Sequence, residues 1–294
     1  MKNRVAVIGS ITKDLIKIGE KSKRCIGGTV YYSGLTLAKL GVKATIITKL
    51  AKADGNILED LKRAGVSIFL SYCRHTTSCE NIYNQTDINK RVQFIRSSSD
   101  PITPFDIPDS IATCDIIHLG PIHKKDIAIE TVSCLERNVD SILSLDVQGY
   151  LREVDSDGKV QLRPWKNKGE VLYAIDVLKA DQEEMITLSE SNNIQHGMTS
   201  IAKEYDISEI IVTCGTKGSM IYSDGTIFNV PCPKALVGDA TGSGDIFISS
   251  YLVARFKDKK APLAAAKYAS RTTSKKIERG LTWLMCQDIG REKF

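Results

Sequence analysis

The 294-residue sequence lacks long apolar runs, and its cysteines form no recognisable disulfide or zinc pattern. No segment approaches the roughly 18 to 20 consecutive apolar residues of a membrane span. The apolar run near the N-terminus, 5–8, is also far too short for a signal peptide. The eight cysteines are scattered and include no C-x-x-C pair of the kind that closes a zinc site. We therefore expect a cytoplasmic protein without a membrane partner, in which the cysteines are reduced and mostly buried.

Concentrated charge of one sign is also missing. The formal net charge is only +5, and the two short basic runs, 21–24 and 257–260, lack interleaved aromatic residues. Solvated surfaces explain such runs better than nucleic-acid contacts do, so we expect no nucleic-acid partner. Apolar residues make up 42% and charged residues 26%, which is ordinary for a globular protein. The length predicts one large domain over 1–294.

Short β-branched runs alternate with stretches of helical period along most of the chain. This alternation predicts repeated βαβ units, a mostly parallel sheet and helices on both of its faces. Two regions, 14–26 and 75–97, break the rhythm, and the second has the pattern of a β-hairpin. A small β-element of this kind can cover a site and exclude water. The expected strands are 4–10, 43–50, 66–72, 115–120, 141–147, 174–180 and 208–215.

The stretch VGDATGSGDIF, 237–247, is rich in glycine but fits neither common phosphate motif. It has no lysine after its glycines, as a P-loop requires, and lacks the G-x-G-x-x-G spacing of a dinucleotide site. Gly242, Ser243 and Gly244 precede an apolar segment that predicts a helix, whose first N–H groups could bind an anion. Asp245 would then either favour the helix dipole or act as a catalytic base.

This stretch resembles the signature of the ribokinase/PfkB family of carbohydrate kinases. Asp239, Thr241, Gly242, Gly244, Asp245 and Phe247 match the signature, and Ser243 stands where alanine is usual. The similarity continues, in the order typical of the family, through VIGSITKDLI (7–16), IGGTVYYSGLTLAKLG (26–41), LKADQEEM (178–185) and IVTCGTKGSMIY (211–222).

The resemblance implies a ribokinase-like fold: a doubly wound, three-layer α/β sandwich with a mostly parallel sheet and a small β lid from about 12–27 and 75–97. It also implies transfer of the γ-phosphoryl group of ATP to a sugar or cyclitol hydroxyl, and a homodimer formed through the lid. For catalysis, the resemblance implies that Asp245 is the general base and that the anion hole is formed by Gly242, Ser243 and Gly244 with the Asp245 amide. The residues implied to bind the acceptor are Asp14, Gly27, Gly28 and Gln148, and Arg152 is implied to lie near the phosphates. The residues implied to bind ATP are Asp181, Thr213, Gly215 and Gly218; Glu184 would hold Mg²⁺ through water, and the backbones of Asp239 and Thr241 would hold a monovalent cation such as K⁺.

Several residues depart from the pattern of the family. Asp181 replaces asparagine and would either strengthen metal binding or weaken phosphate binding. Thr12 and Thr29 replace residues of ribose-specific members, so ribose is not the expected acceptor. The stretch DVQGYLR, 146–152, is similar to the branch that contains myo-inositol kinases. On a plainer interpretation, Asp146 only ends a strand and Arg152 is a solvated helix residue.

Two other functions stay open at this stage. A nucleoside kinase of the same fold would need aromatic residues to stack on the base, and Tyr31, Tyr32 and Tyr83 are candidates. A non-catalytic sugar or nucleotide sensor would not need to keep Asp245. His118 and His123 could be imagined as a metal pair, although their spacing in a Gly-Pro turn favours polar residues near a cleft.

Overall fold

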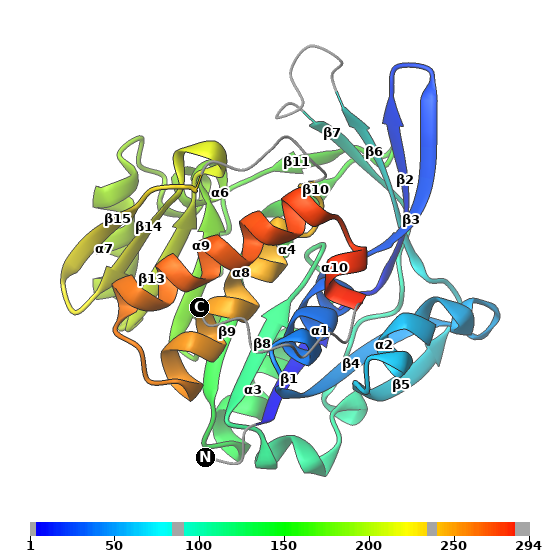
Figure 1. The fold of residues 1–294 in the computed structure, drawn as a ribbon, viewed down its shortest axis with the longest axis horizontal. Helices are drawn as coiled ribbons and strands as arrows, with labels where there is room; N and C mark the ends of the chain where they lie inside the picture. Colours follow the sequence, from blue (N-terminus) through cyan, green and yellow to red (C-terminus); the bar gives the residue numbers. More distant parts are fainter. Residues whose placement is uncertain (1–3, 84–90, 234–239, 286–294) are drawn as a thin grey trace.

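A computed structural model describes residues 4–83, 91–233 and 240–285. Over these residues a central sheet has the strand order β15-β14-β13-β12-β9-β8-β1-β4-β5 (Figure 1). The strands from β13 to β5 pair in parallel, and β14 and β15 add an antiparallel hairpin at one edge. The bounds are β1 Arg4–Gly9, β4 Lys43–Ala51, β5 Ser67–Cys73, β8 Ile116–Gly120, β9 Ile142–Asp146, β12 Val177–Asp181, β13 Glu209–Thr213, β14 Ser219–Ser223 and β15 Thr226–Val230.

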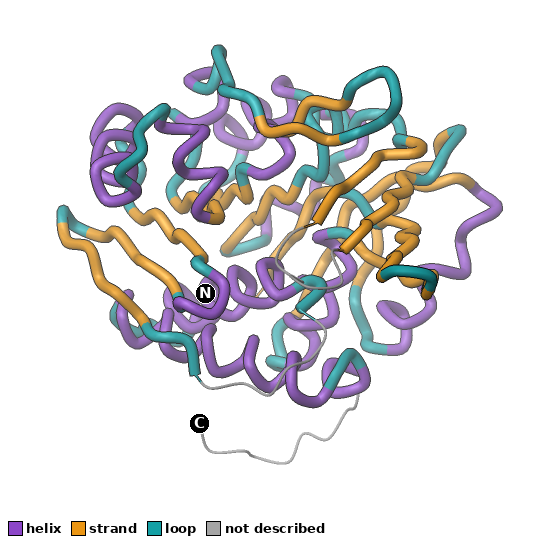
Figure 2. The backbone as a smooth tube through the Cα atoms, turned by 90° about the horizontal axis from the view of Figure 1, so that it is seen from above, coloured by secondary structure: helices purple, strands orange, loops and turns teal. Residues whose placement is uncertain are grey.

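Helices cover both faces of this sheet, as Figure 2 shows from above. The alternation of side chains along β1 explains the two cores: Val5 and Val7 pack on one face, and Ala6 and Ile8 on the other. The first face carries α1 Thr29–Lys39, α2 Glu59–Arg63, α8 Ser243–Leu252, α9 Pro262–Arg279 and α10 Thr282–Met285. The second carries α3 Ile129–Asn138, α4 Gln148–Leu151, α5 Gly169–Leu172, α6 Gln182–Ser189 and α7 Ile194–Tyr205. The doubly wound, three-layer fold predicted from the sequence is confirmed.

The predicted lid is also present, as a second sheet with the strand order β3-β2-β6-β7 that projects from the core (Figure 1). Its strands are β2 Thr12–Ile18, β3 Lys21–Gly27, β6 Thr77–Tyr83 and β7 Arg91–Ser97. The turn between β6 and β7, 84–90, lies outside the described residues. The sequence did not predict a third element, the hairpin of β10 Arg152–Val154 and β11 Val160–Leu162, because three-residue strands are too short to show a period.

The end of the sheet nearest the lid collects polar residues from separate strands. Asp146 is the last residue of β9, Asp181 of β12 and Thr213 of β13. In an open α/β sheet, ligands bind in the crevice beyond the carboxyl ends of the strands. The topology therefore places a site between this edge of the sheet and the lid.

Candidate active site

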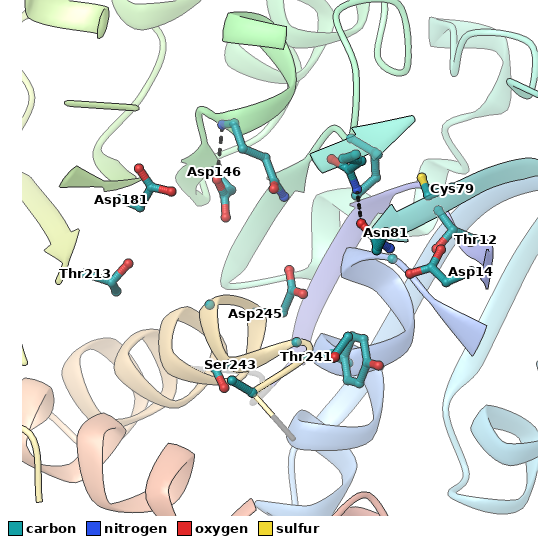
Figure 3. Close-up of a pocket in the computed structure, with 18 of the residues that line it drawn as sticks. Thr12, Asp14, Cys79, Asn81, Asp146, Asp181, Thr213, Thr241, Ser243 and Asp245 are labelled. Atoms are coloured by element: carbon teal, nitrogen blue, oxygen red, sulfur yellow. Dashed lines mark hydrogen bonds between the residues drawn. The ribbon is translucent and has the colours of Figure 1, made fainter. Parts of the chain in front are cut away.

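A cavity of about 280 Å³ lies at this edge of the sheet, under the lid (Figure 3). Twelve residues expected from the sequence line it. Gly27, Gly215 and Gly218 do not line it, and Asp239 lies outside the described residues. The expected residues in the wall are Asp14, Gly28, Gln148, Arg152, Asp181, Glu184, Thr213, Thr241, Gly242, Ser243, Gly244 and Asp245.

The glycine loop ends in the first turn of α8, as the sequence predicts. Gly242 is the N-cap residue with φ 75°, and a side chain there would overlap the ring of Tyr32. Glycine is therefore required both by the left-handed backbone and by the contact. The N–H of Ser243 donates to the carbonyl of Ala240 at 3.0 Å, so this amide already has an acceptor. The next two amides, Gly244 and Asp245, belong to the helix turn whose N–H groups have no acceptor within the helix.

Asp245 stands at the centre of the cavity. Figure 3 shows its carboxylate pointing from the start of α8 into the space between Asp181 and Thr213 on one side and Asp14 and Asn81 on the other. Burial, followed by the negative charge of Asp146, raises the pKa of Asp245 to about 6, against the opposing effect of Lys179. A carboxyl group with a pKa in this range is ionised at neutral pH and is a stronger base than an ordinary aspartate.

A buried lysine beside the first turn of α8 was not anticipated from the sequence. The Nζ atom of Lys179, on β12, lies 2.7 Å from the carboxylate of Asp146, and both side chains are almost fully buried. A Cβ atom placed on Gly244 would lie only 3.1 Å from the same Nζ. The ammonium group therefore adjoins the start of α8, and the charge of Asp146 keeps the pKa of Lys179 raised against the effect of burial. The signal in the sequence was a lone lysine within the apolar strand VLKAD, 177–181.

Asp181 and Glu184 form a capping box at the start of α6. The Glu184 N–H donates to Asp181 Oδ1 at 2.8 Å, and the Asp181 N–H donates to Glu184 Oε2 at 2.7 Å. This reciprocal pairing fixes both carboxylates at the wall of the cavity. Burial raises the pKa of Glu184 to about 7, although Lys179 opposes the shift. The usual asparagine could fill the same cap position, so Asp181 keeps the local fold while adding a negative charge.

The residues present fit a magnesium ion that is coordinated partly by substrate phosphates. Mg²⁺ prefers oxygen ligands and is commonly held by one or two carboxylates together with phosphate oxygens and water. Glu184 and Asp181 supply two such carboxylates. Within the described ranges, no group of three or more histidine, cysteine or acidic side chains could hold a metal by itself.

The lid supplies the opposite wall of the cavity. Residues two apart along a strand share one face, and Thr12 and Asp14 of β2, with Cys79 and Asn81 of β6, all face the cavity. Asn81 accepts a hydrogen bond of 2.9 Å from Gln93 of β7, to which it is paired across the sheet. The wall is therefore largely polar.

Gly27 and Gly28 permit this wall to approach the core. A Cβ atom on Gly27 would lie 2.5 Å from Asp14 Oδ2 and 2.8 Å from Thr12 Oγ1. Gly28 has φ 90°, and a side chain there would overlap the carbonyl of Ser10. Both glycines thus make room for side chains and backbone where β3 of the lid leads into α1, and only Gly28 itself lines the cavity.

The interpretation of Arg152 as a solvated helix residue is wrong. Arg152 begins β10, is 7% exposed, lines the cavity and donates to the carbonyl of Ile122 at 3.3 Å. Gln148 also faces the cavity, and its backbone N–H donates to Asp146 Oδ1 at 3.1 Å. The stretch 146–152 therefore contributes three residues to the cavity wall.

The two histidines of the Gly-Pro turn do not form a metal pair. His118 lies within β8, is fully buried and contacts Ser144 at 3.1 Å, and burial lowers its pKa to about 4. His123 instead pairs with Asp126 at 2.7 Å. Neither histidine lines the cavity.

The doubly wound sheet, the projecting β lid and an acid at the start of a glycine-led helix are the features expected of a kinase that acts on small hydroxyl-bearing molecules. Residues 2–285 match the family model described as pfkB family carbohydrate kinase, and the chain belongs to this family. The chain is accordingly a phosphotransferase with an alcohol group as acceptor. No helix within the described part of the chain has the length and apolar character needed to cross a membrane.

One relative and two solved structures illustrate the branch of the family to which the chain is similar. The inositol 3-kinase of Arabidopsis thaliana is 26% identical over 273 residues, covering 89% of this chain and 70% of the relative. A pyrophosphate-dependent kinase of the ribokinase family, solved with a pyrophosphate analog and myo-inositol, is 28% identical, with a TM-score of 0.83 and coverage of 93% and 94%. A solved structure of a pyrophosphate-dependent myo-inositol-1 kinase, converted into a 3-kinase by replacing one asparagine and one serine with leucine, is 26% identical, with a TM-score of 0.83 and 93% of each chain covered.

Proposed function

We propose that this chain transfers the γ-phosphoryl group of ATP to a hydroxyl of a cyclitol, with myo-inositol as the leading acceptor. The observation that carries the proposal is the position of Asp245 between a polar lid wall and a cluster of charged groups at the carboxyl ends of the central strands. A cyclitol presents hydroxyls around its whole ring, and Asp14, Asn81 and Gln93 offer donors and acceptors to match them. The similarity to the inositol 3-kinase and to the structure with myo-inositol supports the same acceptor class.

In the proposed reaction, Asp245 accepts the proton of the acceptor hydroxyl as its oxygen attacks the γ-phosphorus. The new O–P bond forms while the bond from the γ-phosphorus to the bridging oxygen breaks, and ADP leaves with the electron pair. The amides of Gly244 and Asp245, the positive end of α8 and the ammonium of Lys179 stabilise the charge on the transferring group. Arg152 adds a second buried cation at the cavity wall. The lid excludes water and so suppresses hydrolysis of ATP.

Glu184 and Asp181 would hold Mg²⁺ at the donor side, Glu184 through water. The ion, when bound, neutralises charge on the phosphates and orients them. Thr213, at the end of β13, lies on the same side of the cavity and would contact the donor. Gly215 and Gly218, in the turn beyond it, would contact ATP from outside the described cavity wall.

Pyrophosphate is a second donor that a specific observation favours. The structure solved with myo-inositol is that of a pyrophosphate-dependent kinase. The charged groups around Asp245, which are Lys179 and Arg152 together with the carboxylates that would hold Mg²⁺, would serve either polyphosphate. Assays with each donor separate the two.

The nucleoside-kinase alternative loses one of its three aromatic candidates. Tyr31 is buried in the core and donates to Asp60 at 2.8 Å, so it cannot stack on a base. Tyr32 packs against Gly242, and Tyr83 lies on the lid. A sensor without catalysis is disfavoured by a positioned base with a raised pKa.

Dimerisation through the lid stays a prediction, to be tested by the mass of the protein in solution.

The raised pKa of Asp245 predicts the pH dependence of catalysis. Asp245 must be ionised to accept a proton, so kcat/KM for the acceptor should rise with pH, reach half its maximum near the pKa of about 6, and level off above it. The profile is measured at saturating ATP and saturating Mg²⁺, because Glu184 also has a raised pKa. The Asp245→Asn variant is the control, since titration of ATP is common to both proteins. An identical acid limb in the variant would contradict the assignment.

The hydrogen-bonded pair Asn81 and Gln93 is expected to select the hydroxyl that faces Asp245. In the converted myo-inositol kinase, two polar-to-leucine replacements change which hydroxyl is phosphorylated. Replacing both Asn81 and Gln93 with leucine should likewise change the ratio of inositol phosphate isomers, as measured by NMR of the product. The matched control replaces Ile82 and Val92 with leucine on the same two strands, where both side chains are exposed. An unchanged isomer ratio in an active double variant would show that the pair does not control regiochemistry.

A coupled assay of ADP release, run against cyclitols, ketoses, aldoses and nucleosides, tests the proposed function. The expected result is turnover that depends on a cyclitol and exceeds turnover with every nucleoside. A parallel assay follows consumption of pyrophosphate. ATP binding without turnover on any acceptor, with either donor, would contradict the proposal and favour a sensor.

A further inference from the structure

The described part of the expected monovalent-cation site is occupied by a lysine of the chain itself. The resemblance to the family assigns the carbonyls of Asp239 and Thr241 to a cation such as K⁺. Asp239 lies outside the described residues, but the Thr241 carbonyl accepts a hydrogen bond of 2.5 Å from Lys276 Nζ. A metal ion at this oxygen would have to share it with an ammonium group of the same charge, so the arrangement does not fit K⁺.

Lys276 is fully buried, whereas a lysine on a helix is ordinarily exposed to solvent. It comes from the middle of α9, and its relative exposure is 0%. Burial of an ammonium group destabilises the fold unless polar groups accept its hydrogen bonds. Here the Thr241 carbonyl accepts one of them. The Nζ atom also lies 5.6 Å from the centroid of the Tyr32 ring, a favourable position for a cation.

These contacts connect Lys276 to the anion hole. The Tyr32 ring that lies beneath the Lys276 ammonium also packs against Gly242, the N-cap residue of α8. Thr241, whose carbonyl Lys276 holds, directly precedes that glycine. Lys276 therefore fixes the two residues that lead into the amides of Gly244 and Asp245, and it places an ammonium group behind them.

We propose that the ammonium group of Lys276 takes the place of a monovalent cation, so that phosphoryl transfer by this chain needs neither K⁺ nor NH₄⁺. Lys276 is thus a positioning residue, which acts through the Thr241 carbonyl and does not touch the substrate. The proposal rests on the proposed kinase function for its activity readout.

The first test is a titration of the unaltered protein. Its kcat/KM is measured with magnesium as the sole metal ion and a bulky organic ammonium as counter-ion, and then with added KCl. The expected change is less than about twofold, because the cation is built into the chain. Activation by K⁺ of about tenfold or more, with no such activation by Na⁺ at the same ionic strength, would overturn the proposal.

The second test removes the ammonium group. Lys276→Met should lower kcat by a factor on the order of 10², as expected when an anion hole loses its order, and K⁺ or NH₄⁺ should restore at least about a tenth of the lost activity. Li⁺ and the bulky organic ammonium should not restore the activity of the variant. The matched control is Lys267→Met, which removes an exposed lysine from the same helix and should leave the activity and its salt response unchanged. A Lys276→Met protein with normal activity and no response to K⁺ would also overturn the proposal.

A binding measurement separates this proposal from the kinase function. Calorimetry with Mg²⁺ and ATP, or with pyrophosphate, is performed on the unaltered protein and on Lys276→Met, with and without KCl. K⁺ should strengthen binding only to the variant, even if no acceptor is turned over. Equal K⁺ dependence in both proteins would contradict the role of Lys276 and leave the proposed function untouched.

Discussion

Asparagine in place of Asp245 is expected to lower kcat by a factor of at least about 10², while the Kd for ATP stays nearly unchanged. Asparagine keeps the size of the side chain and the start of α8 but cannot accept the proton of the acceptor hydroxyl. It also removes a carboxyl group whose pKa is raised, so the variant should fold at least as stably as the parent protein. Steady-state kinetics and calorimetric titration with ATP give the two quantities.

Asp258→Asn is the matched control for this variant. Like Asp245→Asn, this variant removes one carboxylate. The side chain of Asp258, in the region that follows α8, is 37% exposed and lies outside the cavity wall. The kcat of Asp258→Asn should equal that of the parent protein. Near-normal turnover by Asp245→Asn would show that the base has been misassigned, and Asp146, the next carboxylate in the cavity, would be the residue to test.

Removal of the ammonium group of Lys179 is expected to have the second-largest effect on catalysis. Lys179→Met preserves the length of the side chain but removes the charge beside Gly244, so kcat/KM should fall by a factor on the order of 10² to 10³. The same change leaves Asp146 buried without its partner, which by itself costs about 3–5 kcal/mol of stability. Thermal unfolding must therefore be measured beside the kinetics.

The double variant Asp146→Asn with Lys179→Met separates catalysis from stability. It removes both charges of the buried pair, so most of the lost stability should return, while kcat/KM should stay low if Lys179 acts on the phosphoryl group. Asp146→Asn alone is the reference for the double variant. Recovery of activity to the level of that reference would show that Lys179 only neutralises Asp146.

The glycine loop illustrates what the sequence alone could predict. Its composition and the apolar segment behind it indicated a helix whose first turn faces an anion, with Asp245 as the acid, and α8 begins at that position. The lid could be predicted equally well, because the alternation of strand and helix stretches breaks off at the two segments that form it. These features are local, so periodicity and turn chemistry report them.

Lys179 and Lys276 show what the sequence could not predict. Each is one lysine among the forty lysine and arginine residues. The apolar strand around Lys179 indicates burial but names no partner, and nothing next to Lys276 in the chain distinguishes it from a solvated lysine. Their roles arise from distant partners: Asp146 lies 33 positions before Lys179, and Thr241 lies 35 positions before Lys276. Only the parallel pairing of β9 with β12 and the packing of α9 on α8 bring these groups together.

The measurement that most directly tests the central claim is ³¹P NMR of the products formed from ATP, Mg²⁺ and myo-inositol. The account predicts a phosphate monoester on the inositol ring, formed in equal amount to ADP. With the Asp245→Asn protein, it predicts a spectrum without the monoester signal. Inorganic phosphate appearing in place of the monoester, or an equal yield of monoester from the Asp245→Asn protein, would contradict the account.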